Sequence, residues 1–372
     1  MAIALLALPA AATAAPQQLL AADLSQAGRK LVLTVRTSKP VPLARLQARP
    51  DTRRASARYL CLGLRGGRGE RRLCLGGPQA HRRLGLVLVN ARGKPVRRAA
   101  AAARVRRPRP RKLVVSLVPE RAGLRPGRLR WRLLESHGCK RRDRCAQALP
   151  AAGARRFRLR PVRAVGCTGG DAGLVTHGPR DRRTVALTFD DGPGELTPDF
   201  LRVLREKGVP ATFFAIGRQV PGREATLRQM LAEGHEIGDH TTDHVEYPGH
   251  SQIAGTRERI RAAAHFQPCL FRPPGGAFDA AVIATAGGLG MATVNWDVDP
   301  FDWQNPGSAA VQSRVLGATG PGSIVLMHDG GGPRGGTLAA LPGIIDTLRA
   351  RGYRFATVSQ LLGHRLVYRP YG

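Results

Sequence analysis

After Cys167 the sequence alternates short apolar runs with segments that have helical periodicity. The first three segments are TVALTF, TPDFLRVLREKG and PATFFAIG, and later helices are expected at 223–233, 252–264, 306–318 and 337–351. In the first helix we expect Thr197 to cap the amino terminus and Gly208 to end the helix. Strands that alternate with helices form a parallel sheet. The sequence therefore predicts an α/β fold with a closed or nearly closed barrel. In such folds the functional residues lie at or just beyond the ends of the strands.

The preceding half, from about Lys30 to Arg163, has a different pattern. Apolar and polar residues alternate in short runs, and Gly, Pro and Arg clusters separate the runs KLVLTVRT, RYLCLGLR, RLGLVLVN, KLVVSLV and RLRWRLL. A period of two indicates strands with one buried face. We therefore expect a small all-β domain of antiparallel strands, similar to a sandwich.

The charge of the chain is divided at the same place. Residues 1–165 contain 39 Lys or Arg against 6 Asp or Glu, whereas residues 166–372 contain 20 of each, so the whole excess of +33 lies in the first half. This predicts a basic β-rich accessory domain at 16–165, followed by a second domain at 166–372.

The first 15 residues have the composition of an export signal. A short apolar stretch is followed by small residues, and Ala12-Thr13-Ala14 matches an A-x-A cleavage site. The usual preceding basic segment is absent, which leaves an ordinary amino terminus as the alternative. We expect a signal peptide at 1–15 and a product that is secreted or associated with the cell surface. No later run approaches the roughly 18 apolar residues of a spanning helix, so no transmembrane segment is predicted.

Six cysteines form an even set, which in an exported chain favours disulfides over free thiols. The pairs that are close in sequence suggest Cys61–Cys74 and Cys139–Cys145, which leaves Cys167–Cys269, although sequence alone permits 15 connectivities for six cysteines. A zinc site is disfavoured because no C-x-x-C pair occurs.

Two adjacent carboxylates, Asp190 and Asp191, end the run TVALTF before a Gly-Pro turn. Neighbours in an extended backbone point to different sides, so one carboxylate can hold a metal while the other faces the reacting water. Asp residues also cap turns, and the motif alone leaves that alternative open.

His240 and His244 are four residues apart, a spacing that places both imidazoles on one side of a helical turn. With Asp191 they form a predicted His2Asp metal site. Three protein ligands leave one position for water, as in catalytic rather than structural sites. Two surface histidines without a metal are the alternative for the pair alone.

Three later motifs also contain candidate functional residues. Arg272 and Gly275 lie in RPPGG, Asp302 and Trp303 lie in DVDPFDW, and Leu326 and His328 lie in IVLMHD. A buried or rim histidine without catalytic use is the alternative for His328 taken alone. The following run GGGPRGG lacks the end of a phosphate-binding P-loop, so we expect a loop at the rim of the site.

These five motifs, in this order, resemble the polysaccharide deacetylases of carbohydrate esterase family 4, also called the NodB-homology family, over residues 183–363. The resemblance implies a deformed (β/α) barrel with one divalent metal, Zn²⁺ or alternatively Co²⁺ or a similar ion. It implies the following roles: metal ligands Asp191, His240 and His244; general base Asp190, oriented by Arg272; general acid His328, paired with Asp302; acetyl-pocket walls Trp303 and Leu326; backbone oxyanion donor Gly275.

The implied reaction is removal of N-acetyl groups from a polysaccharide that contains N-acetylglucosamine, either cell-wall peptidoglycan or a chitin-like glycan. A metal-bound water would attack the amide while Asp190 accepts its proton and His328 protonates the amine. Family members often have an aromatic residue where Gly275 stands and Ser where Asp243 stands. The first difference leaves the substrate subsite open.

Other functions remain as alternatives. An O-acetyl esterase acting on a xylan-type glycan would use the same residues, and a non-catalytic glycan-binding protein would be expected to have lost one of them. Nucleic-acid binding is not expected, because the basic half has arginine without interleaved aromatic residues. The basic half either binds an anionic cell-surface polymer or has an arginine-rich composition that reflects gene base composition and solubility.

Overall fold

The computed structural model describes residues 19–40, 58–66, 69–76, 85–89, 95–101, 104–119, 124–137, 146–168 and 173–371. The chain divides into two compact units, Met1–Val162 with Pro370–Gly372, and Arg163–Arg369. The segment 1–15 and the cysteines Cys139 and Cys145 lie outside the described residues. Within the described part of the chain, no helix is long and apolar enough to cross a membrane.

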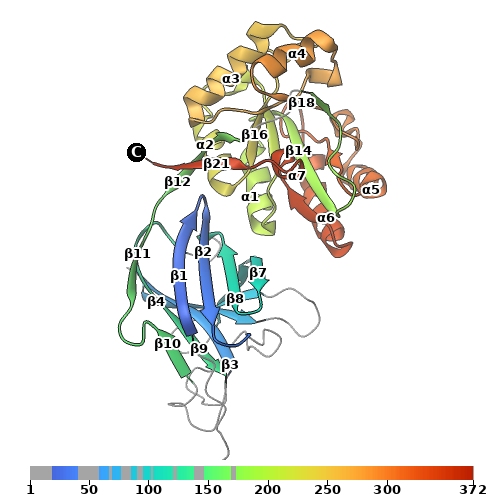
Figure 1. The fold of residues 1–372 in the computed structure, drawn as a ribbon. Coiled ribbons are helices and arrows are strands. Elements are labelled where there is room, and N and C mark those ends of the chain that lie inside the picture. The colour runs from blue at the N-terminus through green and yellow to red at the C-terminus, as the bar shows by residue number, and fades with distance from the viewer. Residues whose placement is uncertain are drawn as a thin grey trace, which may run out of the picture. The chain divides into compact units, whose positions relative to one another are not determined.

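The described strands of the first unit form two antiparallel sheets (Figure 1). One sheet has the order β1 (Leu19–Ala27), β2 (Lys30–Thr37), β8 (Lys112–Leu117) and β7 (Arg104–Arg109). The other has the order β10 (Ala146–Leu149), β9 (Gly127–His137), β3 (Arg58–Gly66), β4 (Gly69–Gly76), β5 (Gly85–Val89) and β6 (Pro95–Ala101), and β11 (Arg155–Leu159) also pairs with β9.

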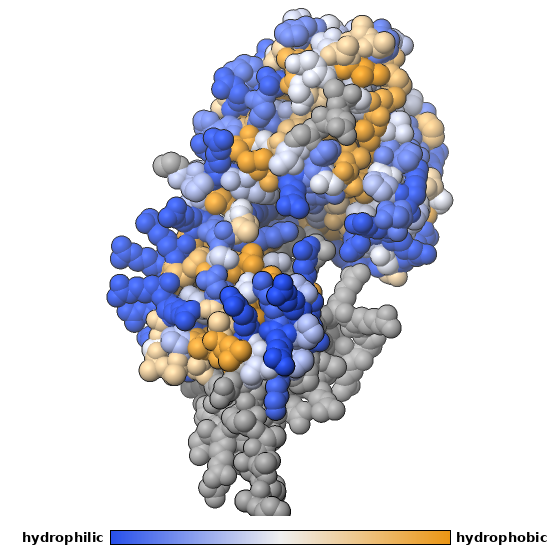
Figure 2. Space-filling model, in the orientation of Figure 1, coloured by the Kyte–Doolittle hydropathy of each residue, from blue (hydrophilic) through white to orange (hydrophobic). Residues whose placement is uncertain are grey.

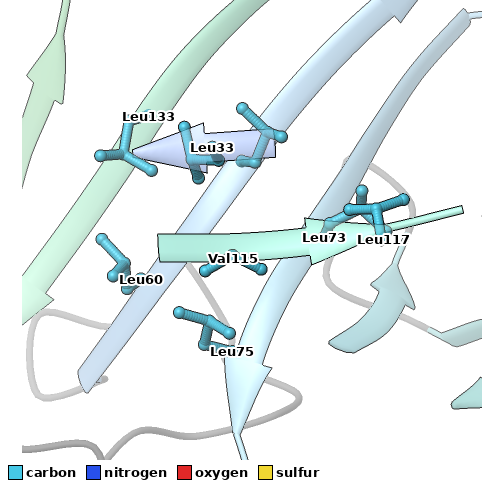
Figure 3. Close-up of a pocket in the computed structure, with 8 residues that line it drawn as sticks. Leu33, Leu60, Leu73, Leu75, Val115, Leu117 and Leu133 are labelled. Atoms are coloured by element: carbon cyan, nitrogen blue, oxygen red, sulfur yellow. The ribbon is translucent and has the colours of Figure 1, made fainter. Parts of the chain in front are cut away.

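Alternate residues of these strands form one apolar core, as the period of two predicts. Figure 3 shows side chains from both sheets around a small apolar cavity lined by Leu33, Leu60, Leu62, Leu73, Leu75, Val115, Leu117 and Leu133. On the opposite side of the second sheet, the predicted disulfide Cys61–Cys74 joins β3 to β4 and is fully buried.

The second unit contains a curled sheet of eight parallel strands, consistent with a deformed barrel. The order is β13 (Leu174–Val175), β18 (Ala292–Val294), β17 (Leu270–Phe271), β16 (Glu236–Asp239), β15 (Thr212–Ala215), β14 (Thr184–Gly192) and β19 (Ile324–Val325), and β20 (Arg354–Ala356) also pairs with β14. Backbone hydrogen bonds extend the pairing beyond the strands, because the Leu326 amide donates to the carbonyl of Val298 at 2.9 Å. The segment after β18 therefore reaches β19 and curls the sheet back toward its first strand.

Helices lie on the outside of these strands (Figure 1). They are α1 (Thr197–Lys207), α2 (Glu224–Glu233), α3 (His250–Ala264), α4 (Ala280–Gly288), α5 (Ser308–Ala318), α6 (Gly335–Ala350) and α7 (Val358–Leu361). The core between helices and sheet includes Phe200 and Leu204 of α1 together with Ile344 and Leu348 of α6. This packing explains why the helical periodicity of the sequence was informative.

The expected helices at 223–233, 252–264, 306–318 and 337–351 are confirmed to within two residues at each end, whereas α4 was not anticipated. Gly208 ends α1 with a φ of 66°, as predicted. The predicted cap was wrong, because α1 begins at Thr197 and its N-cap is Leu196. The Thr197 hydroxyl instead contacts the carboxylate of Asp329, so a tertiary contact uses the group that the local pattern assigned to capping.

The remaining predicted disulfide in the described residues, Cys167–Cys269, is also present. It ties β12 (Val162–Cys167) to the segment that precedes β17. β12 also pairs with β21 (Leu366–Pro370). The disulfide therefore lies beside the paired strands with which the second unit begins and ends in sequence.

Candidate metal and acid–base site

The site residues lie at or just beyond the carboxyl ends of neighbouring strands, as the parallel sheet predicts. Asp190 and Asp191 end β14, and His240 directly follows β16. Arg272 follows β17, and Leu326 and His328 follow β19. Residues far apart in sequence therefore meet because their strands are neighbours.

Asp191, His240 and His244 form the one group of metal-binding character found among the described residues, with candidate ligand atoms within 4.8 Å of one another. Asp191 Oδ1 lies 3.4 Å from His240 Nε2 and 3.1 Å from His244 Nε2. This oxygen is buried and accepts no well-oriented hydrogen bond. Burial raises the pKa of Asp191, but the two imidazoles outweigh burial and hold that pKa well below its ordinary range. A charged oxygen between two imidazole nitrogens is a donor set suited to a divalent cation.

The orientation of His240 is fixed by its second ring nitrogen. Nδ1 lies 2.7 Å from the carbonyl oxygen of Arg272 and donates to it when it carries the proton, which leaves Nε2 facing Asp191. Metal-binding histidines commonly make this outer hydrogen bond. The three side chains thus meet the requirements of a metal site in donor type, burial and orientation.

The expected helical turn at 240–244 is wrong. The segment is a loop after β16, in which Thr241 and His244 have φ angles of 62° and 61°. The Thr241 amide donates to Asp239 Oδ1 at 2.9 Å, and the Thr241 hydroxyl accepts from the Val245 amide at 3.2 Å. These bonds fold the loop so that both imidazoles face Asp191, whose own φ is 70°.

Asp190 is paired with a fully buried guanidinium. Arg272 Nη1 donates to Asp190 Oδ1 at 2.8 Å and to the Thr188 hydroxyl at 2.7 Å, while Nε donates to the carbonyl of Val294 at 3.1 Å. Burial lowers the pKa of Arg272, and the Asp190 carboxylate opposes this effect. The other carboxylate oxygen, Oδ2, lies 3.9 Å from His240 Nε2. Arg272 therefore holds Asp190 with one oxygen directed to the His2Asp cluster.

Asp302 holds His328 through two hydrogen bonds, one to its ring and one to its backbone amide. Asp302 Oδ1 lies 2.7 Å from His328 Nδ1, and Oδ2 accepts from the His328 amide at 2.9 Å and from the Thr337 hydroxyl at 2.8 Å. Burial lowers the pKa of His328, but Asp302 and the nearby carboxylates outweigh burial and raise it. The imidazole is thereby favoured in its protonated form, as a general acid requires.

The expected substrate-contacting residues differ in exposure. Leu326 is buried, whereas Trp303 is 50% exposed. Gly275 has a φ of 63°, and no described group accepts a hydrogen bond from its amide. A Cβ at Gly275 would lie 2.8 Å from Glu246 Oε1. Glu246 therefore occupies space beside Gly275, a contact that no local sequence signal indicated.

Asp329 was also missed as a supporting residue. Its carboxylate accepts a hydrogen bond from the Thr197 hydroxyl, and its amide donates to the carbonyl of Asp190 at 3.1 Å. Burial raises the pKa of Asp329 to about 7. The glycine-rich residues that follow pack on the group of Asp191, His240 and His244, because a Cβ at Gly331 would overlap the Asp191 carboxylate. The glycine-rich segment is therefore part of the wall of the site.

Comparison with known proteins gives one consistent family. The family model described as polysaccharide deacetylase matches residues 177–294. A peptidoglycan-N-acetylglucosamine deacetylase of Bacillus cereus is 42% identical over 196 residues, which cover 50% of this chain and 92% of that protein. A chitooligosaccharide deacetylase of Bradyrhizobium sp. is 40% identical over 198 residues, covering 48% of this chain and 90% of that protein.

A solved structure agrees with the sequence comparison. The crystal structure of a peptidoglycan N-acetylglucosamine deacetylase in complex with 4-naphthalen-1-yl-N-oxidanyl-benzamide superposes with a TM-score of 0.50 and 33% identity. The match covers 52% of this chain and 93% of the other. The chain belongs to the polysaccharide deacetylase family, whose members are metal-dependent hydrolases of N-acetyl amide bonds.

Proposed function

We propose that this chain removes N-acetyl groups from N-acetylglucosamine units of a polysaccharide, either cell-wall peptidoglycan or a chitin-like glycan. The observation that carries the proposal is the convergence of three arrangements at one edge of the sheet. These are the Asp191, His240 and His244 cluster, the Arg272–Asp190 pair and the Asp302–His328 pair. The named activities of the similar Bacillus cereus and Bradyrhizobium proteins support the choice of substrate.

Asp191, His240 and His244 would hold one divalent ion, for which we propose Zn²⁺, with Co²⁺ or a similar ion also accepted by this donor set. When bound, such an ion lowers the pKa of a coordinated water and polarises the amide carbonyl. Asp190 is the proposed general base, because its Oδ2 is directed toward the cluster while Arg272 holds Oδ1.

His328 is the proposed general acid. Its Nδ1 is engaged by Asp302, so Nε2 is the nitrogen left to give a proton to the departing amine. The backbone N–H of Gly275 is the proposed donor to the oxyanion, a kind of donor whose removal typically costs about 3–4 kcal/mol of barrier. Trp303 and Leu326 would form the walls around the acetyl methyl group.

The domain boundaries and location are further proposals. Residues 1–15 would be an export signal, 16–165 a basic, sandwich-like all-β accessory domain, and 166–372 the catalytic domain. The separation into two compact units near residue 162 supports the boundary. The disulfides Cys61–Cys74 and Cys167–Cys269 support a secreted or surface-associated protein, since disulfides persist in oxidising compartments. We propose that the basic domain binds an anionic cell-surface polymer and not nucleic acid.

A panel of acetylated glycans tests the activity. The full chain, loaded with Zn²⁺, is incubated with peptidoglycan, chitin oligosaccharide and O-acetylated xylan, and both acetate and new primary amines are measured. The proposal predicts one new amine per acetate from the first or second substrate. Acetate without new amines, from xylan only, would instead show an O-acetyl esterase. No acetate from any glycan would leave a non-catalytic glycan-binding protein.

A further inference from the structure

The outward face of the second sheet of the basic unit carries a repeated pattern of arginines. In β9 the buried residues Leu129, Trp131 and Leu133 alternate with Arg128, Arg130 and Arg132. Because successive side chains of a strand point to opposite faces, these arginines lie on the face away from the apolar core. Arg128 and Arg130 are exposed there.

The strand register places further arginines beside them. Arg158 of β11 is the partner of Arg128, and Arg156 is the partner of Arg130. On the other side of β9, Arg65 of β3 is also a partner of Arg130. Neighbouring strands are about 4.8 Å apart and alternate residues of one strand about 7 Å apart. Five arginines therefore occupy one small area, which we call the arginine face.

Charges of one sign directly opposite each other destabilise a sheet. The five residues Arg65, Arg128, Arg130, Arg156 and Arg158 are exposed, and within the described residues none of them makes an ion pair. Only Arg65 has an acidic register partner among the described strands, Glu70 of β4. By contrast, the inward-facing Arg155 is used structurally: it donates to the carbonyl of Ala22 at 2.7 Å and lies over the ring of Trp131. The arginine face thus has unused binding capacity that costs folding stability. Figure 2 shows long hydrophilic side chains projecting from this unit.

Composition bias alone does not account for this face. Residues 166–372 of the same chain balance 20 Lys or Arg with 20 Asp or Glu. The first sheet of the same unit also differs, since the middle of its outward face carries Asp23, Thr34 and Val114 in one register row. Basic residues lie instead at one end of that sheet, where Arg36 of β2, Lys112 of β8 and Arg109 of β7 form one register row. That end of the first sheet provides a matched control for any general effect of charge.

We propose that the arginine face binds a phosphodiester-linked polyanion of the cell wall; this rests on the proposed action of the chain on cell-surface glycan. Guanidinium groups bind phosphate oxygens in a bidentate manner, and 34 of the 39 basic residues in 1–165 are Arg. Several weak contacts at repeated spacing suit a repeating polymer, because linked contacts reinforce one another.

Nucleic acid has the same repeating phosphates but also bases. Single-stranded nucleic acids are usually held by aromatic side chains that stack on the bases. Trp131 is 3% exposed on the inward face, and Phe157 packs against the apolar core. The described part of the arginine face therefore has no aromatic platform, which favours a polymer without bases. Binding would hold the enzyme near its substrate without contributing to the reaction itself.

The experiment compares two variants of the full chain with equal loss of charge. In the first, Arg128, Arg130, Arg156 and Arg158 are each changed to Gln. In the second, four exposed arginines of the first sheet and its adjoining turn are changed to Gln: Arg36, Arg106, Arg109 and Arg111. Binding is measured by sedimentation with purified cell walls, before and after hydrofluoric acid has cleaved the wall phosphodiesters, and by titration with poly(glycerol phosphate) and with poly(dT) at several salt concentrations.

The first variant should bind untreated walls and poly(glycerol phosphate) at least tenfold more weakly, with a salt slope smaller by about 3, whereas the second should stay within about threefold of the parent chain. Removing opposed charges should also raise the melting temperature of the first variant, which shows that it is folded. Equal losses in both variants, binding that survives acid treatment, or tighter binding to poly(dT) would each overturn the proposal. Acetate release from a soluble chitin oligosaccharide should be the same in the parent chain and in both variants. If the parent chain itself releases no acetate, the proposed function is rejected, whatever the binding results are.

Discussion

Nδ1 of His328 lies 2.7 Å from Oδ1 of Asp302, and the second carboxylate oxygen of Asp302 accepts from the backbone amide of the same histidine. The carboxylate thus fixes both the ring and the backbone of His328. Thr337 donates to Asp302 at 2.8 Å, so α6 holds the pair in place. This relationship gives His328 the orientation and the raised pKa that a general acid needs.

Replacing Asp302 with Asn should lower the pKa of His328, because the residue that raises it most loses its charge. Activity that depends on protonated His328 is lost as pH rises through its pKa. The alkaline limb of the kcat profile should therefore move to lower pH, and kcat at pH 8 should fall by about tenfold or more. The Thr337→Val control removes one hydrogen bond but keeps the charge, so an equal shift in that control would contradict this account.

Removing Arg272 should destabilise the barrel unit strongly. The Arg272→Met variant leaves the Asp190 carboxylate, 3% exposed, without its partner, and breaking a buried pair in this way costs about 3–5 kcal/mol. Adding Asp190→Ala should restore part of the free energy of unfolding, since no unpaired charge remains. Denaturant unfolding of both single variants and the double variant checks this, and additive losses would show that the pair is not coupled.

A methyl group at Gly331 should displace Asp191, a proposed metal ligand. Gly331 has a φ of 70°, and a Cβ there would overlap the carboxylate of Asp191. We expect Gly331→Ala to weaken Zn²⁺ affinity at least tenfold in chelator competition. Gly332 is the control because its φ is also positive, at 139°, but a Cβ there meets only the Arg334 side chain at 3.7 Å. Equal weakening in both alanine variants would attribute the effect to backbone strain.

Glu135 should make the stability of the basic unit depend on pH. It is 4% exposed on the core side of β9, and burial raises its pKa from 4.5 to about 7. Since the folded state binds the proton more tightly, stability is lost as pH rises from about 4.5 to 7, by about 3 kcal/mol in total. Glu135→Gln should therefore slow hydrogen exchange of β9 amides at pH 8 and have little effect at pH 4.5. The exposed Glu195→Gln control should change neither, and a stabilisation that is equal at both pH values would refute the assignment.

The site residues that could be predicted from the sequence are those marked by their immediate sequence neighbours. Asp190 and Asp191 stand out because they end an apolar strand, and the parallel order of strands predicts that later strand ends meet them. The loop that orients His244 was predicted wrongly as a helical turn, because its two left-handed residues are stabilised by Asp239 and Thr241 rather than by a pattern of spacing.

Supporting residues were missed for a related reason. Asp329 and Glu246 act through contacts with Thr197 and Gly275, which lie 132 and 29 positions away in sequence. Such contacts follow from the packing of whole elements, and no periodicity in the sequence encodes them. The disulfide Cys167–Cys269 was reached only by pairing the remaining cysteines, and the predicted pair Cys139–Cys145 stays a prediction.

We propose that the Asp191, His240 and His244 group and the Asp190 carboxylate have separate roles in one deacetylation reaction. The most direct measurement compares acetate release from chitin oligosaccharide by the full chain and by Asp190→Asn, each with bound Zn²⁺ counted. We predict that chelation abolishes acetate release by the parent chain and that Zn²⁺ restores it. Asp190→Asn should bind one equivalent of Zn²⁺ but release acetate more slowly by about a hundredfold or more. Undiminished release after chelation, or from the Zn²⁺-loaded Asp190→Asn variant, would contradict the proposal.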